Sequence, residues 1–249
     1  MVRKALIIPD CHIPYEDKRA YELMLAVGKD LDPDEIVILG DYADFYAVSS
    51  HTKDAEMANV MLVDEVFEVI ERLKELNRLF PRAKKVYIEG NHEYRLARYI
   101  SSKAPDLYGA VDVASILELK TLGFEYVPYS PVQKYAVLGS SLIARHEPLA
   151  GGKHVAQNTV EKAMSSVIFG HTHRIQEAQT VAMNGENYRG ISSGWLGDCS
   201  HPVMGYVRSH HQWALGFSVF HLLDDGTWFN YLAHIINYKC WYGENIYEN

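Results

Sequence analysis

Five short polar segments, each following an apolar run, carry residue types that bind metal ions. In chain order they are Asp10-Cys11-His12, Gly40-Asp41-Tyr42-Ala43-Asp44, Gly90-Asn91-His92-Glu93, His146-Glu147 and Gly170-His171-Thr172-His173. Histidine nitrogens and carboxylate or amide oxygens are common protein ligands of divalent metals. The segments offer enough donors to fill most positions around two cations. The candidate ligands are Asp10, His12, Asp41, Asn91, His146, His171 and His173.

Two of these segments place a pair of donors two residues apart. One pair is Asp10 and His12, and the other is His171 and His173. On an extended stretch, side chains at this spacing point to the same side of the chain. We therefore expect each pair to bind a single site.

A glycine directly precedes three of the candidate ligands, namely Asp41, Asn91 and His171. Glycine has no Cβ and permits sharp turns and unusual φ angles. Such a residue lets the chain bend out of a strand and present the next side chain inward. Three glycines in equivalent positions therefore support the choice of these ligands.

The elements that must position these residues alternate between strands and helices in the first half of the chain. Because the carboxyl ends of parallel strands share one edge, the first three polar segments should meet there. The predicted strands are 5–8, 35–39 and 84–88, and the predicted helices are 17–29, 56–80 and 93–101. In the long helix, the predicted apolar face comprises Val60, Val63, Phe67, Ile70, Leu73 and Leu76.

The second half is mainly predicted strand, with a helix over 154–164. The predicted strands are 124–127, 134–138, 141–145, 166–169, 176–183, 216–223 and 228–236. Asn184-Gly185 and Asp225-Gly226 lie between apolar runs and predict two hairpins. These strands favour a second, mixed or antiparallel sheet packed on the first. The fold class is therefore α/β, with two packed mixed sheets flanked by helices.

Composition limits the class of protein. The formal net charge is −8 and hydrophobic residues make up 48% of the chain. The acidic balance argues against a broad basic surface that would bind a nucleic-acid backbone. Any phosphate group that the protein binds must therefore be bound by local groups, for example by bound cations. One sizeable core is possible and no linker separates the halves, which predicts a single domain over residues 1–249.

Cysteine usage and the first residues bear on location. Cys11, Cys199 and Cys240 are widely spaced and form no CxxC pair, which favours free thiols in a reducing compartment. The first apolar run is too short for a signal peptide or a membrane span. We therefore expect a cytoplasmic protein with no membrane partner.

In combination, the five segments resemble the calcineurin-like metallophosphoesterase superfamily, nearest to its bacterial or viral members. The family pattern is DxH, GDxxD, GNH followed by an acid, a lone His, and GHxH. All five parts occur in the family order over residues 10–173. Each part alone is a weak signal, but the combination is specific.

The resemblance implies an αββα sandwich with a binuclear metal centre, in which Asp41 bridges both metals. It assigns Asp10, His12 and His173 to one metal, and Asn91, His146 and His171 to the other. Two divalent cations are expected, with Mn²⁺ favoured and Fe²⁺, Zn²⁺ or Ni²⁺ as alternatives.

The resemblance also implies that His92 lies beside the metals without binding them. It would act as the acid for the leaving oxygen, with Asp44 as its orienting partner. A carboxylate on one ring nitrogen fixes the tautomer and favours the charged imidazolium. A hydroxide activated by the two metals would attack the phosphorus directly.

The sequence departs from the family pattern at two places. Protein phosphatases of the family continue the second motif with Asp-Arg-Gly, whereas here Asp44 is followed by Phe45. Arg95 and Arg98, close to His92 in a predicted helix, are the candidate phosphate ligands instead. The fourth segment has Glu147 where the family often has glycine, so this carboxylate is a candidate to intrude on the second metal or on the substrate.

The sequence therefore predicts a phosphoric ester hydrolase, most simply a phosphodiesterase acting on nucleotides or nucleic acid. The acidic balance favours small substrates or short single strands over duplexes. A protein or small-molecule phosphomonoesterase and a non-catalytic metal-binding scaffold are the alternatives. The oligomeric state stays open.

Overall fold

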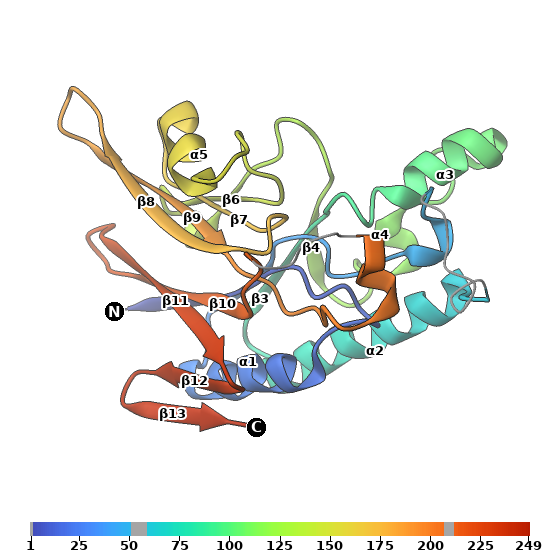
Figure 1. Cartoon of the computed structure of the whole chain (residues 1–249), viewed down its shortest axis with the longest axis horizontal. Helices are drawn as coiled ribbons and strands as arrows, with labels where there is room; N and C mark the ends of the chain where they lie inside the picture. Colours follow the sequence, from blue (N-terminus) through green and yellow to red (C-terminus); the bar gives the residue numbers. More distant parts are fainter. Residues whose placement is uncertain (1, 51–58, 207–211) are drawn as a thin grey trace.

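Two mixed β-sheets form the centre of the protein, and helices cover their outer faces (Figure 1). The computed structural model describes residues 2–50, 59–206 and 212–249, and the elements given below belong to these ranges. The strand order is β13-β12-β11-β10-β1-β2-β3-β4 in the larger sheet and β5-β6-β7-β9-β8 in the smaller sheet. The predicted fold class is therefore confirmed.

The larger sheet combines parallel strands from the first half of the chain with antiparallel strands from its end. It consists of β1 (Arg3–Ile8), β2 (Glu35–Ile38), β3 (Lys84–Ile88), β4 (Phe124–Val127), β10 (Gly216–Leu222), β11 (Trp228–Ile236), β12 (Lys239–Tyr242) and β13 (Asn245–Glu248). β1 to β4 pair in parallel, and β10 pairs antiparallel with β1. The assignment of β4, β10 and β11 to the second sheet was wrong, because the open edges of β1 and β3 accept them. The hairpin β12–β13 was not predicted.

The smaller sheet is built around two parallel strand pairs. It consists of β5 (Tyr135–Ala136), β6 (Ile143–Arg145), β7 (Val167–Phe169), β8 (Ile175–Val181) and β9 (Asn187–Ser193). β6 pairs in parallel with β7, and β7 with β9, while β8 and β9 form a hairpin. The turn of this hairpin contains Gly185 at a φ of 86°. Both predicted hairpins are confirmed, since β10 and β11 are joined through Asp225-Gly226.

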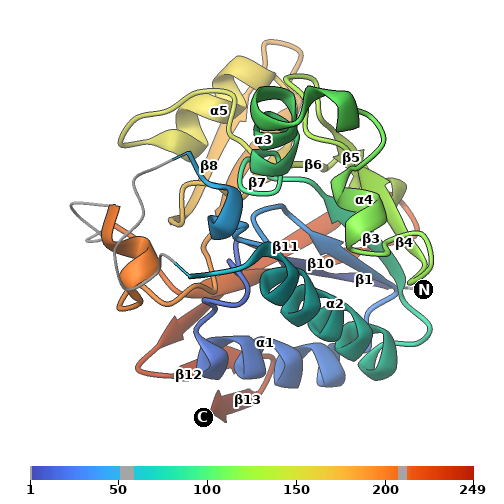
Figure 2. The same cartoon turned by 90° about the vertical axis from the view of Figure 1, so that its right-hand side faces the viewer.

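The helices complete a four-layer arrangement. They are α1 (Lys18–Leu31), α2 (Leu62–Leu79), α3 (Arg95–Lys103), α4 (Val113–Ile116) and α5 (Val155–Ala163), with 3₁₀ turns η1 (Tyr46–Val48), η3 (Pro105–Leu107), η4 (Val137–Gly139) and η5 (Pro202–Tyr206). α1 and α2 cover the larger sheet, and α5 covers the smaller one (Figures 1 and 2). In the described part of the chain, no helix has the length and apolar character needed to cross a membrane.

A buried apolar layer between the sheets fixes how they face each other. Ile7, Val37 and Val86 of the larger sheet pack with Ala144 and Ile168 of the smaller sheet, and each of these side chains is fully buried. Burial of apolar area on this scale stabilises the pairing of the two sheets. The carboxyl ends of β1, β2, β3, β6 and β7 are thereby held at one common end of the sandwich.

The buried face of α2 differs from the predicted one. Its predicted start, residue 56, lies outside the described residues, and the observed helix begins at Leu62. Val63 and Phe67 are 63% and 60% exposed, whereas Leu73 is fully buried as predicted. The helix instead turns Glu65 inward, where its carboxylate accepts hydrogen bonds from the backbone of η1 at 2.9 Å. A polar anchor therefore sets the rotation of the first turns.

Two substitutions in α2 test this rotation. Leu73→Ala should lower the free energy of unfolding by about 2–5 kcal/mol, because it leaves a cavity in the core. Phe67→Ala should lower it by less than about 1 kcal/mol, because the ring is mostly in solvent. Urea unfolding of both variants measures the difference. Equal destabilisation by the two substitutions would show that Phe67 belongs to the core and would contradict this helix rotation.

Candidate metal centre

The loops that leave five strands bring the predicted ligands together at one end of the sandwich. Asp10 and His12 follow β1, Asp41 follows β2, and Asn91 follows β3. The remaining three come from the smaller sheet: His146 follows β6, and His171 and His173 follow β7. The expectation that distant polar segments meet at the strand ends is confirmed.

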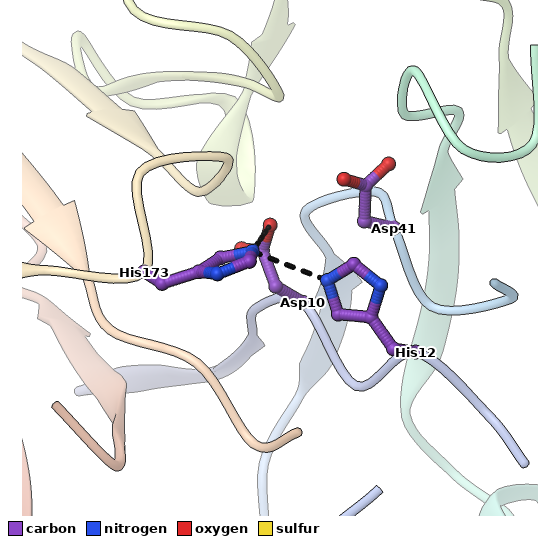
Figure 3. Close-up of side chains that lie close together, drawn as sticks. All are labelled: Asp10, His12, Asp41 and His173. Atoms are coloured by element: carbon purple, nitrogen blue, oxygen red, sulfur yellow. Dashed lines mark hydrogen bonds and ion pairs between the residues drawn. The ribbon is translucent and has the colours of Figure 1, made fainter. Parts of the chain in front are cut away.

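Asp10, His12, Asp41 and His173 form a first group of donors, all of them buried. Their donor atoms lie within 4.8 Å of one another. His12 Nε2 and His173 Nε2 are 3.1 Å apart, and His173 Nε2 lies 3.5 Å from Asp10 Oδ1. Figure 3 shows the imidazoles of His12 and His173 directed toward each other, with the Asp10 carboxylate next to the His173 ring.

Asp41, His146 and His171 form a second group, again with donor atoms within 4.8 Å of one another. His146 Nε2 is 3.3 Å from Asp41 Oδ2. Asn91 joins this group, because its Oδ1 lies 2.9 Å from His146 Nε2 and 2.7 Å from His171 Nδ1. Asp41 therefore belongs to both groups.

Hydrogen bonds fix which ring nitrogen faces the centre in two histidines. His12 Nδ1 donates to Asp44 Oδ2 at 2.9 Å, and His146 Nδ1 donates to the carbonyl oxygen of Leu39 at 2.8 Å. In each ring the Nε2 atom then points to the donor group. A second partner that orients a histidine in this way is typical of metal-binding imidazoles.

The donor set fits divalent cations. Asp10 Oδ2 and His173 Nδ1 are buried without a hydrogen-bond partner among the described residues. Buried carboxylate oxygens are costly unless they are paired with a positive charge or hydrogen-bonded. A cation beside Asp10 would supply that charge, and the mixture of nitrogen and oxygen donors suits divalent metals of intermediate softness.

The pKa values show how strongly the buried charges interact. Burial raises the pKa of Asp10 to about 6, against the opposing effect of His146. Burial lowers the pKa of His146, but the negative charges of Asp41 and Asp10 outweigh it and raise that pKa to about 10. For His173, burial dominates and lowers the pKa to about 3. The carboxylates thus strongly favour a positive charge next to them.

The backbone at the centre adopts unusual conformations at the donors themselves. His12, Asp41, His171 and His173 have φ angles of 55°, 48°, 62° and 57°. Residues other than glycine rarely adopt this region, and each instance costs about 1 kcal/mol or more. Strain of this kind clusters at functional sites, because the surrounding structure must hold it in place.

The glycines before the ligands matter mainly because they have no Cβ, which leaves room for the neighbouring segment. Gly40 has the expected positive φ, at 91°. A Cβ on Gly170 would lie 2.2 Å from Asp10 Oδ2, and a Cβ on Gly90 would lie 2.3 Å from Asp41 Oδ1. The neighbouring segment therefore approaches the glycine backbone closely. The glycines therefore have two physical roles: backbone freedom at Gly40, and close approach of a neighbouring segment at Gly90 and Gly170.

The expectation for the two spaced pairs is confirmed for one and wrong for the other. Asp10 and His12 fall in the same donor group, whereas His171 and His173 are divided between the two groups. The rule assumed an extended stretch. Both histidines of the second pair have left-handed φ angles, whereas in the first pair only His12 does, so the second stretch departs further from an extended chain.

His92 lies beside the donors in a hydrogen-bond network that reaches His12 through Asp44. Its Nδ1 is 3.0 Å from Asp44 Oδ2, as predicted, and its Nε2 is 3.0 Å from Arg95 Nη2. Burial lowers the pKa of His92, but the charges of Asp41 and Asp44 outweigh it and raise that pKa above its usual range. The same Asp44 oxygen also binds His12, so one carboxylate orients both rings.

The two predicted phosphate ligands have different surroundings. Arg95 Nη1 donates to Asp44 Oδ1 at 3.0 Å and to the Asp44 carbonyl at 2.9 Å. Arg98 is exposed and lines a cavity on the far side of Arg95. Arg95 is therefore adjacent to His92, whereas Arg98 is farther out.

Glu93 has a role that sequence reasoning missed. Its buried carboxylate accepts hydrogen bonds from the backbone of Asp41, Tyr42, Ala43 and Gly90 and from the Tyr87 hydroxyl, all at 2.8 to 3.0 Å. It therefore ties the loop after β2 to the loop after β3. The available signal was an acidic residue directly after a predicted ligand segment.

Other side chains complete the surroundings. Trp195 stacks on His173 with ring centroids 4.7 Å apart, and Trp213 contacts the same ring edge-on at 4.2 Å. Glu147 is held by the Tyr129 hydroxyl at 2.6 Å. That bond gives Glu147 a partner outside the two donor groups.

The fold and the buried cluster together define the class of the protein as a metallophosphoesterase, a hydrolase that binds divalent metal ions. The family model described as calcineurin-like phosphoesterase matches residues 3–174. The chain therefore belongs to the calcineurin-like phosphoesterase family. A phosphate-ester substrate follows from this membership.

Two relatives are phage proteins. The gene 54 protein of Mycobacterium phage L5 is 27% identical over 186 residues, and that of Mycobacterium phage D29 is 28% identical over 183 residues. In both comparisons the match covers 70% of this chain and 70% of the relative. The viral side of the resemblance seen in the sequence is thus supported.

Two solved structures are also among the proteins that this chain matches. The phosphoesterase Yfce from E. coli has a TM-score of 0.40 and 15% identity, covering 92% of this chain and 98% of Yfce. The Pseudomonas putida nuclease MPE has a TM-score of 0.36 and 15% identity, covering 91% of this chain and 87% of the nuclease.

A single methyl group should disturb the donor cluster. Gly170→Ala places a Cβ 2.2 Å from Asp10 Oδ2 and should weaken Mn²⁺ binding at least about tenfold, in the range seen when the groups that support a metal ligand are removed. Gly151→Ala is the matched control, because no atom lies within 4 Å of its Cβ position. Titration calorimetry measures both affinities. Unchanged Mn²⁺ affinity in Gly170→Ala would show that Asp10 does not bind the metal.

Proposed function

We propose that this protein is a phosphodiesterase that hydrolyses nucleotide or nucleic-acid phosphodiesters with two divalent cations. The observation that carries the proposal is the sharing of Asp41 by two donor groups, with His92 beside them. Asp10, His12 and His173 would hold one ion, and Asn91, His146 and His171 the other. Mn²⁺ is the favoured metal, with Fe²⁺, Zn²⁺ and Ni²⁺ as alternatives.

When bound, two neighbouring cations lower the pKa of water and neutralise charge on the phosphoryl oxygens. The protein's contribution is to hold the donors in place before substrate arrives. Backbone hydrogen bonds do this: the N–H of His171 donates to Asp10 Oδ1, and that of His92 donates to Asp41 Oδ1, both at 2.8 Å.

His92 is the proposed proton donor for the leaving oxygen. Asp44 accepts a hydrogen bond from Nδ1–H of His92, so Nε2 is the nitrogen available to the substrate. The nearby carboxylates favour the protonated ring, which is the form that an acid requires. Asp44 holds the ring in orientation and stabilises its charge.

Arg95 is the proposed phosphate ligand next to His92. In the described arrangement its Nη2 donates to His92 Nε2. Phosphoryl oxygens are stronger acceptors for a guanidinium than a neutral ring nitrogen is, because both partners are charged. A bound substrate would draw Arg95 from His92, which frees Nε2 to take up a proton from solvent and then donate it to the leaving oxygen.

The residue after Asp44 supports a substrate other than a phosphoprotein. Protein phosphatases of the family have arginine there, whereas Phe45 is fully buried in the core below the donors. Its side chain contributes nothing to phosphate binding.

The three cysteines are free thiols in the described residues, and we also infer a reducing, cytoplasmic location from them.

The proposal is tested by Mn²⁺-dependent rates on bis(p-nitrophenyl) phosphate and p-nitrophenyl phosphate. The diester should be the better substrate. His92→Ala should lower kcat by about 10² to 10⁴-fold, as expected when the acid is removed. Asp41→Asn should abolish turnover, because both donor groups lose a ligand. The exposed His154 provides the matched control, His154→Ala, with unchanged rates.

The outcome also decides among the alternatives. Preference for the monoester, or for a phosphopeptide, would replace the diesterase with a phosphomonoesterase. Metal binding without hydrolysis of aryl esters, nucleotides or DNA would favour a scaffold. Full activity in His92→Ala would contradict the role given to that histidine.

A further inference from the structure

A cavity of about 330 Å³ lies between η1 and α3, next to the network that holds His92. Its walls include Ser49 and Ser50 on one side and Arg95, Arg98, Ser102 and Lys103 on the other. A volume of this size is at the lower end of the range for small-ligand sites. The cavity therefore suits part of a substrate, such as one phosphate with its sugar.

The lining is positively charged in an acidic protein. Of the described residues, three cations and no carboxylate line the cavity, although the chain has a formal net charge of −8. Within the residues that the structure describes, the side chains of Arg98 and Lys103 make no ion pair or hydrogen bond. Ser102 also lines the cavity, where its hydroxyl donates to the carbonyl oxygen of Tyr99. This combination of groups recognises a phosphate anion.

Arg95 connects the cavity to the reaction centre. One side of its guanidinium contacts His92 and Asp44, and the residue also lines the cavity. Arg98 follows on the same face of α3, about 4.5 Å farther along the axis at the usual helix rise. The donors therefore continue from His92 in one direction, as successive phosphates do along a strand.

We propose that this cavity binds the phosphate next to the one being hydrolysed, so that the substrate is a single-stranded nucleic acid. This inference rests on the proposed phosphodiesterase function and names its substrate class. Three local cations suffice for one flanking phosphate, whereas the overall negative charge disfavours the long interface that a duplex makes. Arg98 and Lys103 bind the substrate away from the reacting atoms, so they contribute to affinity and not to the chemical step.

The test measures binding separately from cleavage. In a Mn²⁺-loaded His92→Ala background, which keeps the strand intact, fluorescence anisotropy gives the Kd of a labelled short oligothymidylate. Adding Arg98→Gln and Lys103→Gln should raise the Kd about tenfold and make the slope of log K against log[salt] shallower by about 0.7 for each phosphate of the single strand that is no longer bound. The control adds Lys74→Gln and Arg78→Gln, an equal charge change on the exposed side of α2.

Each result decides the matter. An equal rise in Kd in the control pair, or no rise in either pair, would overturn the subsite. With an otherwise wild-type chain, Arg98→Gln/Lys103→Gln should lower kcat/KM for cleavage of the oligonucleotide more than for bis(p-nitrophenyl) phosphate, since that diester has one phosphate. A matching decrease in the rate on that diester would also overturn the subsite. Absence of any diester hydrolysis by the wild type would refute the proposed function alone, because the Kd comparison does not depend on turnover.

Discussion

The rest of the structure depends on the burial of Asp10 and Asp41 side by side at one end of the sandwich. The two carboxylates are 0% and 2% exposed, and burying such charges is unfavourable without partners. Each carboxylate accepts one backbone N–H from a neighbouring donor segment, and histidines surround both. The family and this cluster indicate divalent metal ions, whose charge would complete the compensation. The same concentration of negative charge explains why the pKa values of His146 and His92 are raised.

Holding this charge in place requires other groups that never touch a phosphate. Glu93 joins two loops through their backbone N–H groups, and Asp44 orients His12 and His92 at once. The left-handed conformations at four donors show that the loops are fixed by these interactions and not by local preference. A precise arrangement of this kind spares the protein from reorganising during the reaction.

Much of the fold and of the cluster could be predicted from the sequence, because both rest on local patterns. Apolar runs marked the strands, and polar residues after them marked the common edge. Pairing between distant strands has no local signal, so the place of β10 in the larger sheet was missed. The rotation of α2 was also missed, since it depends on the hydrogen bond that Glu65 accepts from the backbone of η1. The prediction that the side chains of His171 and His173 point to the same side failed for a similar reason, because the turn departs from the assumed extended chain.

The central claim, that the two donor groups hold two cations through a shared Asp41, is tested most directly by anomalous diffraction from Mn²⁺-soaked crystals. The account predicts two anomalous peaks about 3.5–4 Å apart, both adjacent to the Asp41 carboxylate. One should lie beside His12 and His173, and the other beside Asn91 and His146. A single peak, or peaks away from Asp41, would contradict the account.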